Sequence, residues 1–464
     1  MGTLHPKILP DDFRAFSQTL EGRVRSRHHA EYASWYYSTA WNKRDFERYP
    51  EYIVRAASID DVVKSVNFAR SHRLRVALKG SGHSYAGSFF HRGGVLLDLS
   101  ALNIIDVDAQ HERATVGPGV TSGMLSDALA PHGLAFPTGH GSNVGLAGFL
   151  LGGGLGINCD AWGGMSTFNV IAVDVVTADG RLLHANETEN AEVLWAARGG
   201  GPFLFFAVVR FHLKVWPKPK AILARSYPVD AVNLKHVLRA LCTRRDDPRM
   251  QIMVALGGAE GLPAALSASV FCDDMRQATV LHEALRADVD PWVGEFGEQA
   301  LGSFDPIYQQ TQQAMASKRY RADNIMSDAV EQVADALLSG MRARPSPRTF
   351  SLVIMRPERG YGDAAYSLHG RMSVSTYAQW NDEDEDELNR DWLRGVYDEL
   401  ARFATGSYIN EFDLETRSQE VASCYSEDSW WRLQRLRQRY DAAGVFPGVS
   451  VLGADVAERE YVAG

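Results

Sequence analysis

The sequence predicts an α+β protein of two domains, in which a glycine-rich first domain precedes a second domain built on an antiparallel sheet covered by helices. Three observations lead to this fold class. The chain has 464 residues, more than one domain usually holds. Its glycines gather in the first half, and strand and helix patterns alternate between residues 220 and 404. Between these regions, the stiff segment 216–219 carries two prolines and marks a domain boundary.

The composition is that of an ordinary globular protein, with 45% hydrophobic and 23% charged residues. A net charge of −9 argues against the basic face that nucleic acids and anionic membranes require. No run of about 18 apolar residues is present to span a membrane, and residues 1–25 lack a signal-peptide core. We therefore expect a cytoplasmic protein without a nucleic-acid or membrane partner, and the composition leaves the oligomeric state open.

Capping residues place the helices of the first domain. Ser58 and Asp61 predict a capping box at the start of a helix whose apolar residues recur at helical spacing. Thr121 predicts the cap of a second helix that ends at Gly133, and Thr188 the cap of a third through residue 197. The expected strands cover residues 74–78, 95–99, 113–116, 169–178 and 203–215, with a type I′ turn at residues 179–180.

The rest of the chain is expected to form a second domain over residues 219–404 and a C-terminal segment over residues 405–464. The expected helices cover about 231–244, 276–287, 327–343, 384–402 and 430–440, and the expected strands cover about 249–256, 265–271, 348–355 and 371–378. A further strand is expected to end at residues 407–411. The acidic run 382–387 is interpreted as a solvated helix start rather than a metal site.

The loop at residues 78–87 organises the first domain. It follows an apolar strand, and its glycines let the backbone turn tightly and approach a ligand. Successive N–H groups in such a loop form a nest for anionic oxygens, most often those of phosphate. His83 is its chemically capable side chain, although a histidine in a glycine turn more often only hydrogen-bonds.

A second glycine-rich stretch runs from residue 136 to residue 156 and contains eight glycines, three of them consecutive at 152–154. Helix packing would account for Gly145 and Gly148. It would not account for the run of three, since each glycine inside a helix costs roughly 1 kcal/mol relative to alanine. The stretch therefore predicts an extended ligand that lies against bare backbone.

Together these motifs resemble the FAD-linked oxidases of the vanillyl-alcohol-oxidase or p-cresol-methylhydroxylase (PCMH) fold, in the branch of berberine-bridge-enzyme-like and 6-hydroxy-D-nicotine-oxidase-like flavoproteins. The resemblance covers roughly residues 40–218 and 405–446. It rests on residues 79–87, 96–99, 139–156, 175–180, 194–201, 408–410 and 440–446. It implies an FAD-binding domain over residues 1–218 (PCMH-type), a substrate-binding domain over 219–404, and a C-terminal segment that returns to the FAD domain.

The resemblance also implies roles for individual residues. His83 matches the histidine that bonds to the 8α-methyl group of the flavin ring. Asn410 matches an asparagine that reaches the pyrimidine edge of that ring. The pyrophosphate loop corresponds to Gly80, Ser81, Gly82 and Ser84, and ends at Gly87. The residues that line the ring and the ADP part correspond to Gly139, Gly141, Val144, Gly145, Gly148 and Gly154.

Two positions refine this comparison. Many relatives carry a second covalent anchor, a cysteine, at the position of Gly141, so we expect FAD bound covalently through His83 only. In these relatives a valine at the position of Val144 usually accompanies oxidase behaviour. The stretch 203–205 departs from the family pattern near the cofactor, which leaves a protein that holds FAD without turnover as one alternative.

The expected reaction is hydride transfer from a C–H bond next to an alcohol or amine to flavin N5, followed by reduction of O2 to H2O2. Tyr408 is the first candidate for the base, and His140 beside the glycine stretch is the second. Glu411 is interpreted as structural, because it would point away from Asn410 on a strand. The alternating set Arg371, Ser373, Ser375 and Tyr377 fits either a pocket wall or, preferentially, a half-exposed strand.

The expected substrate is a small molecule. A sugar alcohol, an amine or alkaloid, and a polycyclic phenolic metabolite all stay open, with a small hydrophobic or aromatic natural product favoured. A flavin dehydrogenase that does not use O2 is the other alternative. A nicotinamide-dependent Rossmann enzyme is disfavoured, because no G-x-G-x-x-G motif occurs in the chain.

Overall fold

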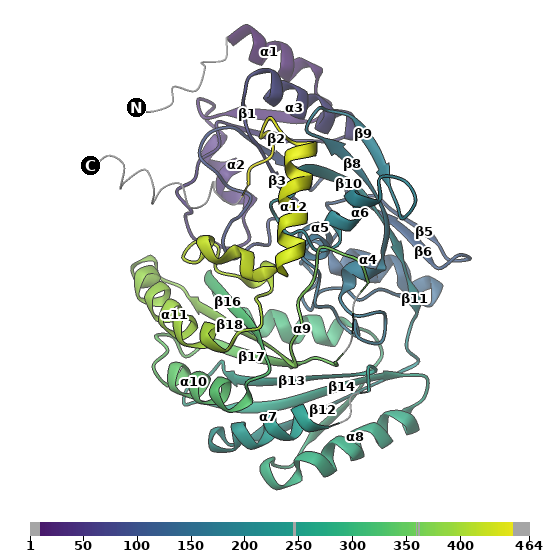
Figure 1. Cartoon of the computed structure of the whole chain (residues 1–464), viewed down its shortest axis with the longest axis vertical. Coiled ribbons are helices and arrows are strands. Elements are labelled where there is room, and N and C mark those ends of the chain that lie inside the picture. The colour runs from purple at the N-terminus through teal and green to yellow at the C-terminus, as the bar shows by residue number, and fades with distance from the viewer. Residues whose placement is uncertain (1–9, 245–246, 359, 361, 449–464) are drawn as a thin grey trace.

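A computed structural model describes residues 10–244, 247–358, 360 and 362–448 of the chain (Figure 1). Two sheet assemblies form its two halves. A seven-stranded antiparallel sheet occupies the lower half of Figure 1, and three smaller sheets with their helices occupy the upper half. This mixture of sheets and helices confirms the predicted α+β fold class.

The N-terminal part of the upper half is a four-stranded sheet of order β1-β2-β4-β3. Its strands β2, β4 and β3 are parallel, and β1 pairs with β2 antiparallel. Ser58 caps α3 by accepting the N–H of Asp61, as predicted, but the Asp61 carboxylate accepts from Glu21, Gly22 and Ala57 instead of closing the box. The elements are α1 (Pro10–Thr19), β1 (Arg23–Ser26), α2 (Tyr32–Thr39), β2 (Tyr52–Arg55), α3 (Ile59–Ser71), β3 (Val76–Lys79) and β4 (Val95–Asp98).

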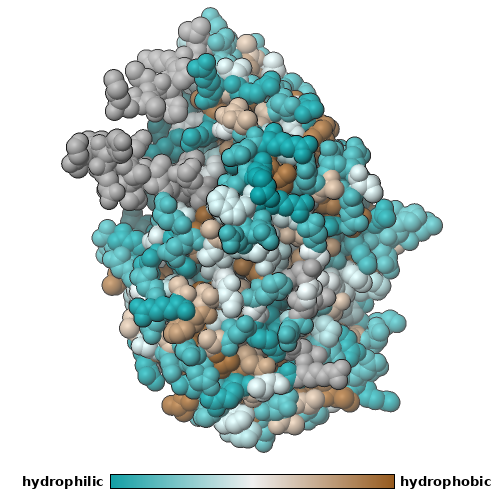
Figure 2. All heavy atoms as spheres, in the orientation of Figure 1, coloured by the Kyte–Doolittle hydropathy of each residue, from teal (hydrophilic) through white to brown (hydrophobic). Residues whose placement is uncertain are grey.

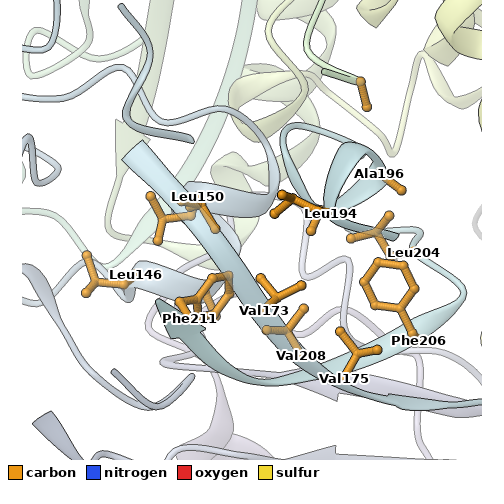
Figure 3. Close-up of a cluster of buried hydrophobic side chains, with 14 of the residues drawn as sticks. Leu146, Leu150, Val173, Val175, Leu194, Ala196, Leu204, Phe206, Val208 and Phe211 are labelled. Atoms are coloured by element: carbon orange, nitrogen blue, oxygen red, sulfur yellow. The ribbon is translucent and has the colours of Figure 1, made fainter. Parts of the chain in front are cut away.

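The rest of the upper half is a five-stranded antiparallel sheet of order β5-β6-β10-β8-β9. Figure 3 shows its core, where Val173, Val175 and Val208 of the sheet meet Leu146 and Leu150 of α5. The elements are β5 (Ile105–Asp108), β6 (Arg113–Val116), α4 (Ser122–Leu129), α5 (Leu146–Leu151), β8 (Val170–Thr177), β9 (Leu182–Ala185), α6 (Ala191–Ala197) and β10 (Phe206–Lys214), with β7 (Leu134–Ala135) paired to β11 (Trp216–Pro217).

The lower half is the seven-stranded sheet of order β15-β12-β14-β13-β17-β18-β16. Four helices cover its lower face, where alternate apolar side chains of the strands form one core (Figure 1). The opposite face points toward the upper half. The strands are β12 (Ala221–Val229), β13 (Met250–Gly257), β14 (Ala264–Cys272), β15 (Gly297–Leu301), β16 (Arg319–Ser327), β17 (Phe350–Met355) and β18 (Met372–Trp380), and the helices are α7 (Leu234–Thr243), α8 (Met275–Val289), α10 (Val330–Arg342) and α11 (Asp386–Leu400).

The last described segment connects the halves. It includes a short 3₁₀ turn, Ile409–Glu411, and helix α12 (Glu427–Tyr440). Leu433 and Leu436 of α12 join the core of the five-stranded sheet. Beyond the helix, the Val76 N–H donates to the carbonyl of Val445 at 2.7 Å, so the segment reaches the edge of the first sheet. The division into domains at residues 218 and 404 stays a prediction.

Of the predictions that rest on a few neighbouring residues, some are confirmed and others are wrong. Thr121 caps α4, and Gly133 takes the left-handed conformation at the end of the following turn, as expected. The type I′ turn is wrong, because only Gly180 of residues 179–180 has positive φ, in a three-residue hairpin loop. The Thr188 cap is also wrong, since α6 begins after Asn190.

Two predictions that concern the site are wrong as well. Residues 407–411 form no strand, since the 3₁₀ turn occupies their second half. Strand β18 is buried along its whole length rather than half-exposed. In the lower half the prediction also missed β12, β15, β16 and α9 (Asp305–Ala314), and in the upper half it missed α1, β1, α2, β2, β5, α5 and the short strands β7 and β11.

Candidate active site

A cavity of about 790 Å³ lies between the two halves. The upper half lines it with the two glycine-rich stretches and with residues 408–412. The lower half lines it with α9 and with the upward-facing residues of the sheet, including Met253 of β13, Leu352 of β17 and Tyr377 of β18. The cavity therefore has one wall built from glycine-rich backbone and one wall built from side chains.

The first glycine loop offers free donors to this cavity. Within the described residues, the N–H groups of Ser81, Gly82 and His83 meet no acceptor. Gly82 has φ of +82°, and a Cβ there would lie 2.0 Å from the carbonyl oxygen of Thr39. The loop thus lines the cavity and carries amides without an acceptor, which an anionic group requires.

The second glycine stretch lies directly against the first. The Gly145 N–H donates to Ser81 Oγ at 3.1 Å, and a Cβ on Gly145 would lie 2.4 Å from that oxygen. In the same described region, the N–H groups of His140, Gly141 and Asn143 meet no acceptor. Two rows of open amides therefore face one space, which is the arrangement that a dinucleotide with a pyrophosphate fits.

His83 lines the cavity in a fixed orientation. Its ring stacks on Trp41 at 4.2 Å between centroids, and Trp41 stacks in turn on Tyr320 at 4.3 Å. Burial lowers the pKa of His83 to about 4, against the opposing effect of a hydrogen bond with the Asn143 side chain. The imidazole is therefore neutral at pH 7 and keeps a lone pair available for bond formation.

Most of the predicted cofactor-binding residues line this cavity. They are Gly80, Ser81, Gly82, His83, Ser84, Gly139, Gly141, Val144, Gly145, Gly148 and Asn410. Gly87 and Gly154 lie outside the lining, and packing accounts for both. A Cβ on Gly87 would lie 2.8 Å from the Phe46 ring, and a Cβ on Gly154 would lie 2.8 Å from the Phe149 ring.

Tyr408 presents its hydroxyl to three donors. Asn410 Nδ2 lies 2.9 Å from the hydroxyl oxygen, the Gly154 N–H at 3.0 Å and the Leu155 N–H at 3.3 Å. Burial and the nearby charge of Glu411 nevertheless raise the pKa of Tyr408 above its ordinary value, against the effect of these donors. Tyr408 and Asn410 are thus brought together as predicted, through a hydrogen bond rather than a shared strand face.

Asn324 of β16 holds this tyrosine in place from the lower half. The Tyr408 N–H donates to Asn324 Oδ1 at 2.6 Å, and Asn324 Nδ2 donates to the Tyr408 carbonyl at 2.8 Å. The fully buried Asn324 therefore pairs with both backbone groups of one residue, as a neighbouring strand would.

His140, the second candidate base, also lines the cavity. Burial lowers the pKa of its imidazole, and a hydrogen bond with Gln251 opposes this effect. Its Nε2 is buried without a hydrogen-bond partner among the described residues. This nitrogen is the kind of buried polar atom that a bound group completes.

The expectation that Glu411 points away from Asn410 on a strand is wrong in its geometry, because a 3₁₀ turn replaces the strand. Glu411 is one of the residues that line the cavity, and its structural role stays a prediction. Ser375 and Tyr377 of β18 donate to its two carboxylate oxygens at 2.5 Å and 2.8 Å. The sequence analysis also missed Trp41 and Tyr85, although Tyr85 follows His83 by two residues.

Comparisons with known proteins agree with this geometry. Residues 50–186 match the family model described as FAD binding domain. Over 430 residues (89% of this chain and 93% of the relative) the chain is 28% identical to the FAD-linked oxidoreductase janO of Penicillium janthinellum. Over 184 residues, 40% of each chain, it is 35% identical to (R)-6-hydroxynicotine oxidase of Paenarthrobacter nicotinovorans.

Among solved structures, BBE-like 1 of Physcomitrella patens superposes with a TM-score of 0.82 and 19% identity, over 94% of this chain and 98% of that one. The fold is that of the two-domain FAD-binding structures of the PCMH type, which include berberine-bridge-enzyme-like proteins, as the sequence predicted. Along most of its length the chain is similar to FAD-linked oxidoreductases.

The surface is in keeping with this assignment. Figure 2 shows a largely hydrophilic face on which hydrophobic residues are scattered. None of the helices in the described ranges is both long and apolar enough to cross a membrane.

Proposed function

We propose that the protein is an FAD-dependent oxidase that acts on a small organic molecule carrying an alcohol or amine. The single observation that supports this function is the cavity, which joins a wall of open backbone amides to a wall of side chains. When bound, FAD accepts hydride from the C–H bond next to that alcohol or amine and passes the electrons to O2, which yields H2O2.

In this proposal the backbone wall holds the cofactor. The open amides around Ser81 and Asn143 bind the pyrophosphate, and Asn410 lies beside the ring. His83 forms the covalent bond to FAD, since its imidazole is neutral and held by stacking on Trp41. Gly141 offers no thiol for a second bond, so attachment is single.

Tyr408 is the proposed proton acceptor for the substrate. Tyr408 would accept a proton as its phenolate, and the three N–H groups around its oxygen would stabilise that form before the substrate proton is transferred. His140, whose Nε2 is buried without a partner among the described residues, orients the substrate in the same space.

The experiment that tests cofactor and anchor together is acid denaturation of the purified protein followed by intact-mass measurement. We expect a yellow precipitate and a mass increase of one FAD, both lost in His83→Ala and both retained in His132→Ala, an exposed histidine outside the cavity. A colourless precipitate with FAD in the supernatant would contradict the covalent bond but not FAD binding. Absence of flavin from both fractions would contradict the proposed function.

Oxygen use can be tested without knowing the substrate. Light-driven reduction of the flavin followed by mixing with air-saturated buffer should restore the oxidised spectrum rapidly and release one H2O2 per FAD. Slow reoxidation, with fast transfer to an artificial acceptor instead, would identify a flavin dehydrogenase. A cofactor that cannot be reduced by any candidate substrate would favour a protein that only holds FAD.

A further inference from the structure

The charges of the cavity lining are few. Among the lining residues, Glu411 is the one carboxyl group and Arg348 the one arginine or lysine. Arg348 is exposed, whereas Glu411 is only partly accessible. Tyr377, which donates to Glu411, and the neighbouring Tyr408 are buried. Apart from the exposed Arg348, Glu411 therefore has no other acidic or basic residue than histidine beside it in the lining.

Glu411 differs from the other buried carboxylates of this region, each of which has an arginine partner. Asp323 pairs with Arg417 at 3.0 Å, Asp413 with Arg321 at 3.1 Å, and Glu415 with Arg44 at 2.8 Å. Among the described residues, no lysine, arginine or histidine forms an ion pair with Glu411. Burial without a counter-charge raises the pKa of Glu411, so its charged form lacks a stabilising partner that a cationic ligand can supply.

The carboxyl group is nonetheless held firmly. Ser375 Oγ and the Tyr377 hydroxyl each donate to one of its oxygens, and both residues come from the fully buried strand β18. An ionised carboxylate has about four acceptor positions, and these bonds use two of them. The remaining positions are left for a donor that arrives through the cavity.

The residues around Glu411 indicate the chemistry of the rest of the ligand. The neighbouring upward-facing side chains of the sheet are apolar: Met253, Phe350, Leu352 and Ile354 line the same cavity. An apolar wall beside a lone carboxylate suits a molecule that joins an aromatic or alkyl body to a cationic nitrogen.

We propose that Glu411 binds the protonated amine of the substrate, which makes an aryl- or alkylamine the substrate class of this enzyme. This inference rests on the proposed function, because it places the ligand in the same cavity. It selects the amine from the substrate classes that the sequence left open.

Binding of a cation at Glu411 also affects the proposed base. The charge of Glu411 raises the pKa of Tyr408, and a bound ammonium group offsets that charge. A bound ammonium group therefore lowers the pKa of Tyr408 and favours its phenolate, the form that can accept a proton, whereas a neutral ligand of the same shape does not. The contact between Glu411 and the ammonium group would therefore both bind the substrate and favour the active form of Tyr408.

The test compares two probes that differ at one end, 2-phenylethylamine and 2-phenylethanol. Each is titrated under anaerobic conditions into the FAD-loaded protein, and binding is followed by the change in the flavin absorption spectrum. We expect the amine to bind about tenfold more tightly than the alcohol at pH 7. Equal affinities, tighter binding of the alcohol, or no spectral change with the amine at millimolar concentrations would each overturn the proposal.

The variant Glu411→Gln keeps the shape and removes the charge. We expect it to lose about tenfold in affinity for the amine and to change its affinity for the alcohol by less than about threefold. Glu399→Gln, which removes an exposed carboxylate on α11, should change neither. An equal loss for both probes in Glu411→Gln would show that Glu411 is only structural.

If Glu411→Gln does not fold, the comparison of the two probes in the unmodified protein still tests the proposal. The outcome is also separable from that of the proposed function. Flavin content and H2O2 release report on the oxidase function, whereas the ratio of the two affinities is measured without turnover. If the protein binds FAD and prefers the amine but releases no H2O2, the proposed amine site at Glu411 stands and only the oxidase function is contradicted.

Discussion

The two walls of the cavity are built on opposite principles. The upper wall presents backbone amides, and its side chains are mostly absent because glycine occupies the positions closest to the cavity. The lower wall presents side chains from β13, β17, β18 and α9, and its backbone is fully engaged in the antiparallel sheet. Backbone amides are the same at every residue, so a backbone wall suits a ligand such as phosphate that needs only N–H donors. A side-chain wall can be altered one residue at a time.

Under the proposed function, the upper wall binds the cofactor and the lower wall binds the substrate. Substitution in the upper wall fills space that the ligand or the neighbouring loop needs. Substitution in the lower wall changes the shape and charge of the chamber while the sheet remains. We therefore expect substitutions in the upper wall to abolish cofactor binding. Substitutions in the lower wall should change only the affinity for the substrate or the stability of the fold.

The largest effect is expected for Gly82→Ala. Its φ of +82° is unfavourable for alanine, and the added Cβ would lie 2.0 Å from the Thr39 carbonyl oxygen. The loop must move, so FAD content should fall to near zero and the thermal midpoint should drop. Flavin absorbance per protein and a melting curve measure both. Full FAD content in this variant would show that the loop is not the phosphate site.

A sharper test is Gly148→Ala. Outside its own helix and chain neighbours, no described atom lies within 4 Å of a Cβ at this position. The protein without FAD should therefore melt at an equal or slightly higher temperature, since alanine suits a helix better than glycine. FAD content should fall severalfold if the cofactor lies against Gly148. Gly395→Ala, equally unobstructed but located in α11, should keep full FAD content. Loss of FAD in both variants would remove Gly148 from the cofactor site.

The junction between the walls is expected to depend on pH. Burial would raise the pKa of Glu415, but Arg44 and Arg321, one from each half, lower it to about 2. A carboxyl group with a lowered pKa stabilises the fold above its unfolded pKa and loses this contribution as pH falls. We expect a few kcal/mol of stability to disappear between about pH 4.5 and pH 2.

Urea unfolding at successive pH values measures this loss, and Glu415→Gln supplies the control. The variant should be less stable at pH 6 and should show a shallower decline below pH 4.5. A decline of unchanged slope in the variant would assign the acid sensitivity to other carboxylates.

The smallest effect is expected for Phe350→Ala in the side-chain wall. Truncation of a phenylalanine in a closed core costs about 3–5 kcal/mol, and Phe350 should lose less because one side already faces the cavity. FAD content should stay complete. Denaturant unfolding and flavin absorbance measure the two quantities. Loss of FAD here would contradict the separation of cofactor from substrate between the walls.

The backbone wall could be predicted from the sequence, and most of the side-chain wall could not. The signals for the upper wall are local: glycine clusters, a histidine within one of them, and caps such as Ser58 and Thr121. The missed strand β16 reads as a polar segment, because Arg321 and Asp323 are charged. Both are buried by partners about 90 positions away, Asp413 and Arg417.

The same reason explains Glu411. Its orientation depends on the 3₁₀ turn at residues 409–411, and Asn324 fixes the start of that turn through a contact across 84 positions. Alternation along an assumed strand placed the carboxyl group on the wrong side. Side-chain direction in an irregular segment follows from tertiary contacts, which no local pattern contains.

The contact between Val76 and Val445 bears on how the protein is made. Val445 and Phe446 complete the core of the first sheet, together with Val54, Val66 and Val95 from far earlier in the chain. During synthesis this core therefore lacks two of its apolar side chains until the ribosome has released nearly the whole described chain. A nascent chain arrested after α11 would leave the first sheet without these packing partners.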